Sequence, residues 1–293
     1  MVRSYSYQKP GLHLYSKYTR GYYRLATVII PNNKSFTRRI LKSVLYYVLF
    51  YAAITGFTAG LLGLYMNRLI DKNRPLLTGL QSALRGEPGL SVVPITDTGH
   101  TLIAFKNFRD DTFLIYNDAL YAFMYAYEDS SQMQDSLRQC DFINNTHQSL
   151  DVDLDRSSCV FNANWAYRCN INRMFGYDDS SPCFILTLNS IYGWLPSTQN
   201  GVTVCCHGAT PNDDDLIGTL CIYDALVHDE EGCDRSCGLF PQQYFPYLNQ
   251  ESYMAPLVFL EVRDPRKNVL ISIQCELENT TNPSRIEFEL LVD

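Results

Sequence analysis

Several residue types are missing from the N-terminal part of the chain. The first 139 residues contain no cysteine, the first 43 no acidic side chain, and residues 44–66 no charged side chain of either sign. With 46% hydrophobic and 19% charged residues, the chain as a whole is neither disordered nor of low complexity. Its net charge of −7 argues against a general nucleic-acid-binding protein. The distribution of cysteine and charged residues therefore divides the chain into three parts: a basic tail, an apolar segment, and an acidic remainder that carries the cysteines.

Residues 44–66 are predicted to cross a membrane. Twenty-three uncharged residues make a helix about 34 Å long, and a hydrocarbon core is roughly 30 Å thick. A cleavable signal peptide is shorter, lies nearer the N-terminus and ends at a small-residue cleavage site. Nine basic side chains precede the segment, and basic flanks stay in the cytoplasm. The pattern predicts a single-pass type II protein, with a cytoplasmic tail at 1–43 and residues 67–293 outside.

The cysteines agree with this orientation. All ten lie in the predicted exterior, and an even number there is typical of a disulfide framework of up to five bridges. Spacing alone leaves the pairing open. The alternative is a zinc site, but an oxidising compartment favours disulfides over thiolate ligands. Its ligands would come from Cys205, Cys206, His207, Cys233 and Cys237.

Glycosylation sequons lie in the predicted exterior at Asn144 and at Asn279. Both have the Asn-x-Thr pattern and are expected to carry glycans in a secretory compartment. A third sequon, at Asn33, lies on the predicted cytoplasmic side and is expected to stay unmodified.

The exterior residues predict a stalk at 67–112 and a mainly β domain at 113–293. A helix is expected from a cap at Asn117 and Asp118 to about residue 139. Apolar or alternating runs predict strands at 183–189, 256–262, 269–277 and 286–290. A period of two, with turn residues between the runs, is typical of an antiparallel sandwich, and the helix is expected to pack against one side.

The common catalytic motifs are missing from the sequence. It has no nucleophile elbow, P-loop or dinucleotide-binding glycine pattern, and its five histidines form no i, i+4 ligand pair. Asp151, Asp153 and Asp155 form a D-x-D pattern that could hold a divalent metal in a glycosyltransferase. Such enzymes alternate strands and helices around a nucleotide crevice, and this chain lacks that alternation. We therefore expect a non-enzymatic protein without a cofactor or metal.

The predicted span has features of a helix–helix contact. Gly56 and Gly60 form a G-x-x-x-G pattern, which lets another helix approach closely. Tyr47 and Tyr51 lie one turn apart, and Tyr51 is about two turns into the span. That depth favours a protein partner for its hydroxyl. The alternative is that these tyrosines belong to an interfacial aromatic belt.

An ordered series of motifs runs through the chain from the span to the last strands. They are Tyr47-Val-Leu-Phe-Tyr51, Pro88-Gly-Leu-Ser-Val-Val-Pro94, Gly176-Tyr177, Pro182-Cys-Phe-Ile-Leu-Thr-Leu-Asn189, Gly193-Trp-Leu-Pro196, Phe240-Pro-Gln-Gln-Tyr-Phe-Pro-Tyr247 and Tyr253-Met-Ala-Pro-Leu257. With these motifs, residues 44–293 resemble the beta subunits of sodium/potassium-transporting and proton/potassium-transporting P-type ATPases. Each motif is weak alone, but their order, with the cysteines and the topology, is specific.

The resemblance implies an immunoglobulin-like sandwich outside the membrane, held by three disulfides. The implied pairs are Cys140–Cys159, Cys169–Cys183 and Cys206–Cys275. Four further cysteines have no implied partner, namely Cys205, Cys221, Cys233 and Cys237.

The resemblance also implies an accessory role beside a catalytic alpha subunit. A beta subunit of this family assembles with alpha, permits its delivery to the plasma membrane and tunes potassium affinity, whereas alpha hydrolyses ATP. The implied contacts with alpha are Tyr47, Tyr51, Gly56, Gly60, Phe240, Tyr244 and Tyr247. Two alternatives stay open: a beta subunit of a proton/potassium pump, and a cell-surface adhesion or junction protein that uses the same fold without a pump.

Overall fold

A computed structural model of the chain consists of two compact units, Met1–Asp71 and Lys72–Asp293. The structure describes residues 34–71, 74–78, 86–95, 101–106, 111–131, 137–142, 158–250, 253–280 and 283–293. Asn144 and the D-x-D residues Asp151, Asp153 and Asp155 lie outside these ranges.

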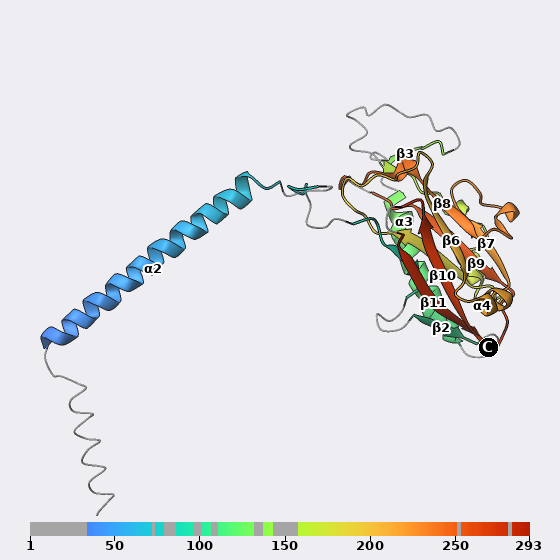
Figure 1. The fold of residues 1–293 in the computed structure, drawn as a ribbon, viewed down its shortest axis with the longest axis horizontal. Coiled ribbons are helices and arrows are strands. Elements are labelled where there is room, and N and C mark those ends of the chain that lie inside the picture. Colours follow the sequence, from blue (N-terminus) through green and yellow to red (C-terminus); the bar gives the residue numbers. More distant parts are fainter. Residues whose placement is uncertain are drawn as a thin grey trace, which may run out of the picture. The chain divides into compact units, whose positions relative to one another are not determined.

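The described residues of the first unit form a long helix, α2, at Lys34–Arg68 (Figure 1). Phe36–Arg68 is long and apolar enough to be a candidate membrane span. The helix begins ten residues before the uncharged stretch at 44–66, because residues 34–43 contain no glycine or proline and include the good helix formers leucine, arginine and lysine. Nearly all of its described side chains are exposed, so the apolar ones need lipid or another helix to cover them.

The second unit is a β-sandwich, which confirms the expected fold class (Figure 1). One sheet has four antiparallel strands in the order β1-β5-β9-β7. Their bounds are β1 (Leu90–Val93), β5 (Cys183–Leu188), β9 (Leu257–Arg263) and β7 (Thr219–Tyr223). The runs at 183–189 and 256–262 are thus strands, as their apolar composition predicts.

The other sheet has five strands in the order β2-β11-β10-β6-β8. Their bounds are β2 (Leu102–Phe105), β11 (Arg285–Val292), β10 (Leu270–Glu278), β6 (Gly201–Gly208) and β8 (Cys237–Pro241). All pairs are antiparallel except β2 with β11, which is parallel. A short parallel pair also joins β3 (Leu137–Arg138) to β4 (Ser158–Cys159).

The assignment of residues 67–112 to an irregular stalk was partly wrong. Both β1 and β2 fall in this range, so the sandwich begins at Leu90. Each strand is only four residues long, too short for an alternating pattern to be distinguished from loop sequence.

The core forms where the two sheets face each other. Along β10 the residues Ile271, Ile273, Cys275 and Leu277 are buried and alternate with more exposed ones, as a period of two requires. Across the interface, the ring centroids of Phe184 in β5 and Phe288 in β11 lie 4.9 Å apart.

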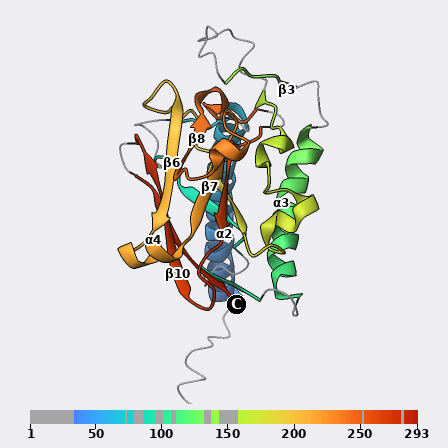
Figure 2. The same cartoon turned by 90° about the vertical axis from the view of Figure 1, so that its right-hand side faces the viewer.

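A helix, α3 (Leu114–Ser131), packs on the outer face of the four-stranded sheet (Figure 2). It buries Leu120 and Met124, as expected, and the Tyr127 hydroxyl donates to the Ala255 carbonyl at 3.1 Å. The expected cap at Asn117 and Asp118 was wrong, because a 3₁₀ turn, η2 (Asp111–Phe113), precedes the helix and starts it earlier.

Short helical segments complete the sandwich. η5 (Ala163–Ala166) and η6 (Ile171–Gly176) lie beside α3 over the same sheet face. Elsewhere the unit contains α4 (Pro211–Leu216), η7 (Glu230–Gly232) and η8 (Gln242–Tyr244). As a result, β5 and β9 are buried on both faces.

Five disulfides hold this unit, and they use all ten cysteines. The pairs are Cys140–Cys159, Cys169–Cys183, Cys205–Cys237, Cys206–Cys275 and Cys221–Cys233. Three of them are the pairs that the family resemblance implies. The adjacent Cys205 and Cys206 of β6 sit directly opposite Cys237 of β8 and Cys275 of β10. The strand β6 is therefore linked covalently to both of its neighbours.

Removal of the Cys206–Cys275 bridge by the double substitution Cys206→Ala/Cys275→Ala should lower the free energy of unfolding by about 4 kcal/mol, because the bridge spans 69 residues. Urea unfolding of the detergent-solubilised chain, with the other four bridges intact, measures the change. An unchanged unfolding midpoint would contradict this pairing.

Candidate functional site

The tyrosines and glycines of α2 lie on opposite sides of the helix. At 100° per residue, Tyr51 is about 40° from Tyr47, whereas Gly56 and Gly60 are about 180° and 220° from it. The Tyr47 and Tyr51 rings stack with centroids 6.5 Å apart, and the two residues are 56% and 62% exposed. The expected contact residues of the helix therefore form two faces: a tyrosine face (Tyr47, Tyr51) and a glycine face (Gly56, Gly60).

The glycine face is open to close approach. Apart from the adjoining residues and the backbone of the helix itself, no described atom lies within 4 Å of a Cβ built on Gly56 or Gly60. On the side of the helix that carries the tyrosines, Thr58 donates its hydroxyl to the Ile54 carbonyl at 3.0 Å, and Thr55 donates to the Tyr51 carbonyl in the same way. The threonine hydroxyls are thus satisfied within the helix, whereas the Tyr47 and Tyr51 hydroxyls have no described partner.

In the second unit, two expected contact residues belong to the core. Phe240 in β8 is 0% exposed and Tyr244 in η8 is 4% exposed. The Tyr244 hydroxyl donates to the Val160 carbonyl at 3.3 Å. Their side chains pack the domain and do not reach its surface. Tyr247, the third expected residue, is half-buried.

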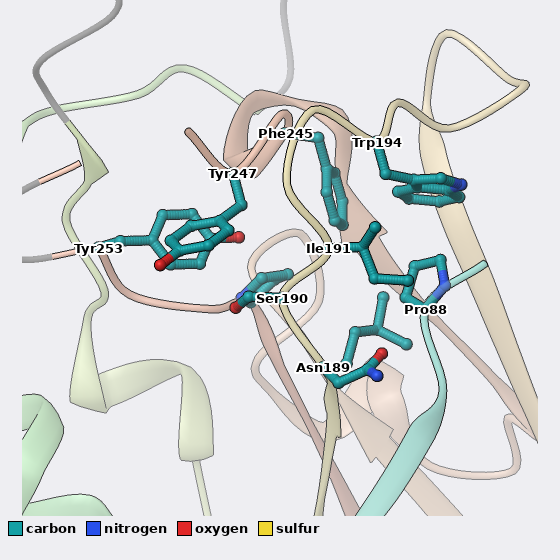
Figure 3. A pocket seen from close by; sticks show the side chains of 10 residues that line it. Pro88, Asn189, Ser190, Ile191, Trp194, Phe245, Tyr247 and Tyr253 are labelled. Carbon is teal, nitrogen blue, oxygen red and sulfur yellow. The ribbon is translucent and has the colours of Figure 1, made fainter. Parts of the chain in front are cut away.

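Tyr247 is part of an aromatic cluster at one end of the sandwich, formed with Trp194, Phe245 and Tyr253 (Figure 3). Ring centroids lie 5.4 Å apart for Trp194 and Phe245, and 4.8 Å apart for Tyr247 and Tyr253. The hollow among them has a volume of about 10 Å³, enough for no more than one water molecule. The cluster therefore offers a surface and not a small-molecule pocket.

Backbone hydrogen bonds bring distant segments to this cluster. The Gly193 amide donates to the Tyr247 carbonyl at 2.8 Å, and the Asn189 amide donates to the Gly89 carbonyl at 3.1 Å. The Asn189 side chain accepts from the Gly89 amide in return. Motifs that are far apart in the sequence thus meet where residues 86–89 enter the sandwich.

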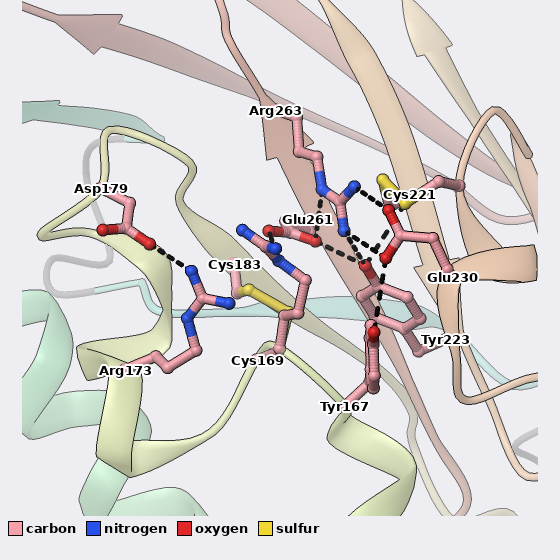
Figure 4. Close-up of polar contacts among 12 residues, drawn as sticks. Tyr167, Cys169, Arg173, Asp179, Cys183, Cys221, Tyr223, Glu230, Glu261 and Arg263 are labelled. Atoms are coloured by element: carbon pink, nitrogen blue, oxygen red, sulfur yellow. Dashed lines mark hydrogen bonds and ion pairs between the residues drawn. A yellow bond between two sulfur atoms is a disulfide. The ribbon is translucent and has the colours of Figure 1, made fainter.

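A buried charge network lies on the outer face of β9 (Figure 4). Glu261 is 1% exposed and accepts from Arg168 at 3.0 Å, Arg263 at 3.1 Å and Tyr223 at 2.5 Å. Arg263 also pairs with Glu230 at 2.7 Å. Sequence reasoning missed this network, although an acidic residue inside the apolar run of β9 was a usable signal.

The network ties surface segments to the sheet. Arg168 comes from the segment between η5 and η6, and Glu230 begins η7. Burial, followed by the hydrogen bond to Glu261, raises the pKa of Tyr223 above its usual value. A carboxylate buried to this degree is stable only when charged donors compensate it, so Arg168 and Arg263 are structural partners of Glu261.

The cysteine-rich regions do not fit a metal site. Cys221, Cys233 and Glu261 lie close enough to share an ion, but the two sulfurs are joined in a disulfide and the two arginines hold the carboxylate. The cysteines of the zinc alternative are likewise all in disulfides. A disulfide sulfur is not a thiolate ligand, so that alternative fails.

Comparison with known proteins gives one family. Residues 33–286 match the model of the sodium/potassium ATPase beta chain. The sodium/potassium-transporting ATPase subunit beta-2 of Drosophila melanogaster is 23% identical over 291 residues, covering 85% of this chain and 84% of the relative. A probable beta-3 subunit of Caenorhabditis briggsae is 23% identical, covering 85% and 78%. The human protein ATP1B4 is 25% identical, covering 85% and 66%.

Alkaline pH should destabilise the sandwich. Burial is the largest cause that raises the pKa of five tyrosines, Tyr127, Tyr177, Tyr223, Tyr244 and Tyr253. Because each folded-state pKa lies above the unfolded value of about 10, their contribution is complete below that pH and is lost as the pH rises further. The temperature at the midpoint of thermal unfolding should therefore be lower at about pH 11.5 than at about pH 9.

Tyr177→Phe provides the matched variant, because the Tyr177 hydroxyl is buried with no hydrogen-bond partner among the described residues. The variant should lose less stability than the wild type over the same pH interval. The claim that burial raises these five pKa values would be contradicted by two results together. All tyrosines would show tyrosinate absorbance near pH 10, and the thermal midpoint would not change with pH.

Proposed function

Because the chain belongs to the sodium/potassium ATPase beta-chain family, we propose that it is the accessory beta subunit of a sodium/potassium-transporting ATPase. It assembles with the catalytic alpha subunit, stabilises it, enables its delivery to the plasma membrane and tunes potassium affinity. Alpha carries out ATP hydrolysis and ion coordination. The family match carries this proposal, since residues 33–286 include the candidate span and almost all of the sandwich. The names of the relatives support sodium/potassium over proton/potassium transport.

The proposed orientation is type II, with a cytoplasmic tail at 1–43, a span at 44–66 and the sandwich outside the cell. The nine basic residues before the span support this, as does the concentration of all five disulfides in the second unit. ER and extracellular compartments are oxidising, so the domain that carries the bridges is proposed to face them.

The proposed contact with alpha in the membrane is the tyrosine face of α2. Two stacked phenol rings present a large apolar surface with two hydroxyls. In a lipid core those hydroxyls gain from partners on a neighbouring helix. A helix of alpha that covers Tyr47 and Tyr51 would satisfy both requirements.

Outside the membrane, we propose that alpha contacts the aromatic cluster around Tyr247. Trp194, Phe245, Tyr247 and Tyr253 are each only partly buried, and Leu195 beside them is 55% exposed. Half-covered aromatic rings are typical of contact surfaces between proteins. This surface replaces Phe240 and Tyr244, whose side chains are internal.

The orientation predicts a glycan at Asn279. This residue is exposed at the turn between β10 and β11. Asn279→Gln should therefore remove one glycosidase-sensitive step in gel mobility. Asn33→Gln is the control and should change nothing. Loss of a glycan from Asn33 and not from Asn279 would reverse the proposed orientation.

Tyr47→Leu/Tyr51→Leu should weaken association with alpha without preventing membrane insertion. Loss of two ring contacts and two hydroxyl partners should reduce co-purified alpha about tenfold, equivalent to roughly 1.4 kcal/mol. The readout is the ratio of alpha to beta after co-expression and purification in mild detergent. Tyr46→Leu, an aromatic residue about 100° around the helix from Tyr47, is the matched control. Equal recovery with the double variant and the control would exclude the tyrosine face as the contact.

A further inference from the structure

The first turns of α2 carry an unpaired basic cluster, Arg38, Arg39 and Lys42. All three side chains are exposed, and none forms an ion pair with a described residue. The whole helix contains no acidic residue. Arg38 and Lys42 are a pair of like charges at i, i+4, and such pairs repel each other on a helix. An anion from outside the helix would relieve this repulsion.

Helix geometry places this cluster at the level of lipid headgroups. Lys42 lies two residues before the uncharged stretch that starts at Val44, and Arg38 lies six residues before it. Along the axis these separations are about 3 Å and 9 Å. The headgroup layer on each side of a bilayer is about 5–7 Å thick. Because the helix is continuous through this region, Lys42 lies within the headgroup layer. Arg38 lies just beyond its outer edge, from which a long arginine side chain can reach back to the phosphates.

The cluster occupies one side of the helix. Arg38 and Lys42 are four residues apart, about 40° around the axis, and Arg39 follows at 100°. Phe36 and Ile40 lie on the opposite side and are about half exposed. This division of basic and apolar side chains is typical of a helix segment at a membrane interface. The other end of α2 differs, because Arg68 in its last turn is followed by Asp71.

We propose that Arg38, Arg39 and Lys42 form a binding site for anionic phospholipid headgroups in the leaflet that they adjoin. The ligand chemistry is a phosphodiester with an additional negative charge, as in phosphatidylserine. Guanidinium groups match phosphate oxygens geometrically, and an anionic leaflet attracts each basic residue with about a fivefold preference. If the orientation proposed above is right, this leaflet is the cytoplasmic one. The lipid contact itself does not depend on that orientation.

The test uses the full chain, purified without alpha and reconstituted into phosphatidylcholine bilayers. Electron paramagnetic resonance measures the association of spin-labelled phosphatidylserine relative to spin-labelled phosphatidylcholine. The wild type should prefer phosphatidylserine at least about threefold at low salt, and high salt should reduce this preference. Arg38→Gln/Arg39→Gln/Lys42→Gln should bring the ratio close to one.

Two variants control for charge and position. Arg38→Lys/Arg39→Lys keeps the charge and should retain most of the preference. Arg68→Gln removes one charge at the other end of the helix, beside Asp71, and should change the ratio less than Lys42→Gln. Equal ratios for the wild type and the triple glutamine variant would overturn the proposal. Competition by millimolar glycerophosphoserine would also overturn it, because the site would then serve a soluble anion.

The result of the lipid experiment can be told apart from the result of the test for association with alpha. A wild-type chain that prefers phosphatidylserine but recovers no alpha subunit would refute the accessory role and leave the lipid site standing. Loss of alpha recovery by the triple glutamine variant, with its lipid ratio unchanged, would assign the basic cluster to a protein partner and overturn the lipid site.

Discussion

The structure of the second unit depends on the burial of β5 and β9 on both of their faces. One face packs against the five-stranded sheet, where Phe184 meets Phe288, and the other is covered by α3 and the 3₁₀ segments. A strand covered on both sides tolerates few polar residues, yet Glu261 sits in the middle of this layer. Arg168 and Arg263 compensate its charge, because a lone carboxylate there would cost several kcal/mol. The same ion pairs fasten the surface segments that would otherwise leave β9 exposed.

Disulfides and aromatic contacts extend this rigidity to the surface. β6 is bonded covalently to both neighbouring strands, and the segment between β7 and β8 is closed by Cys221–Cys233. At one end of the sandwich, the turn around Gly193 is hydrogen-bonded to Tyr247, so Trp194 and Tyr247 are presented from a fixed backbone. A rigid aromatic surface loses little conformational entropy on binding. The span supplies a second aromatic surface in Tyr47 and Tyr51.

Much of the fold could be predicted from residue patterns. Alternation in β10 and β11 identified both strands, and the uncharged stretch at 44–66 identified the candidate span, although α2 begins earlier. Three disulfide pairs followed from family resemblance, since spacing alone could not pair ten cysteines. The failures have physical causes. β1 and β2 are too short to show a period, and the parallel pairing of β2 with β11 is a tertiary contact. Phe240 and Tyr244 look like contact residues in a motif, but burial is decided by the packing of the whole domain.

A pump subunit should be recovered from its membrane together with the catalytic chain. The tagged protein is purified from its native membranes in mild detergent, and its partners are identified and quantified by mass spectrometry. The account predicts a P-type ATPase alpha chain at close to one-to-one stoichiometry, and the identity of that chain would name the transported ions. Recovery of other cell-surface proteins without an alpha chain would contradict the account and favour an adhesion protein that uses the same fold.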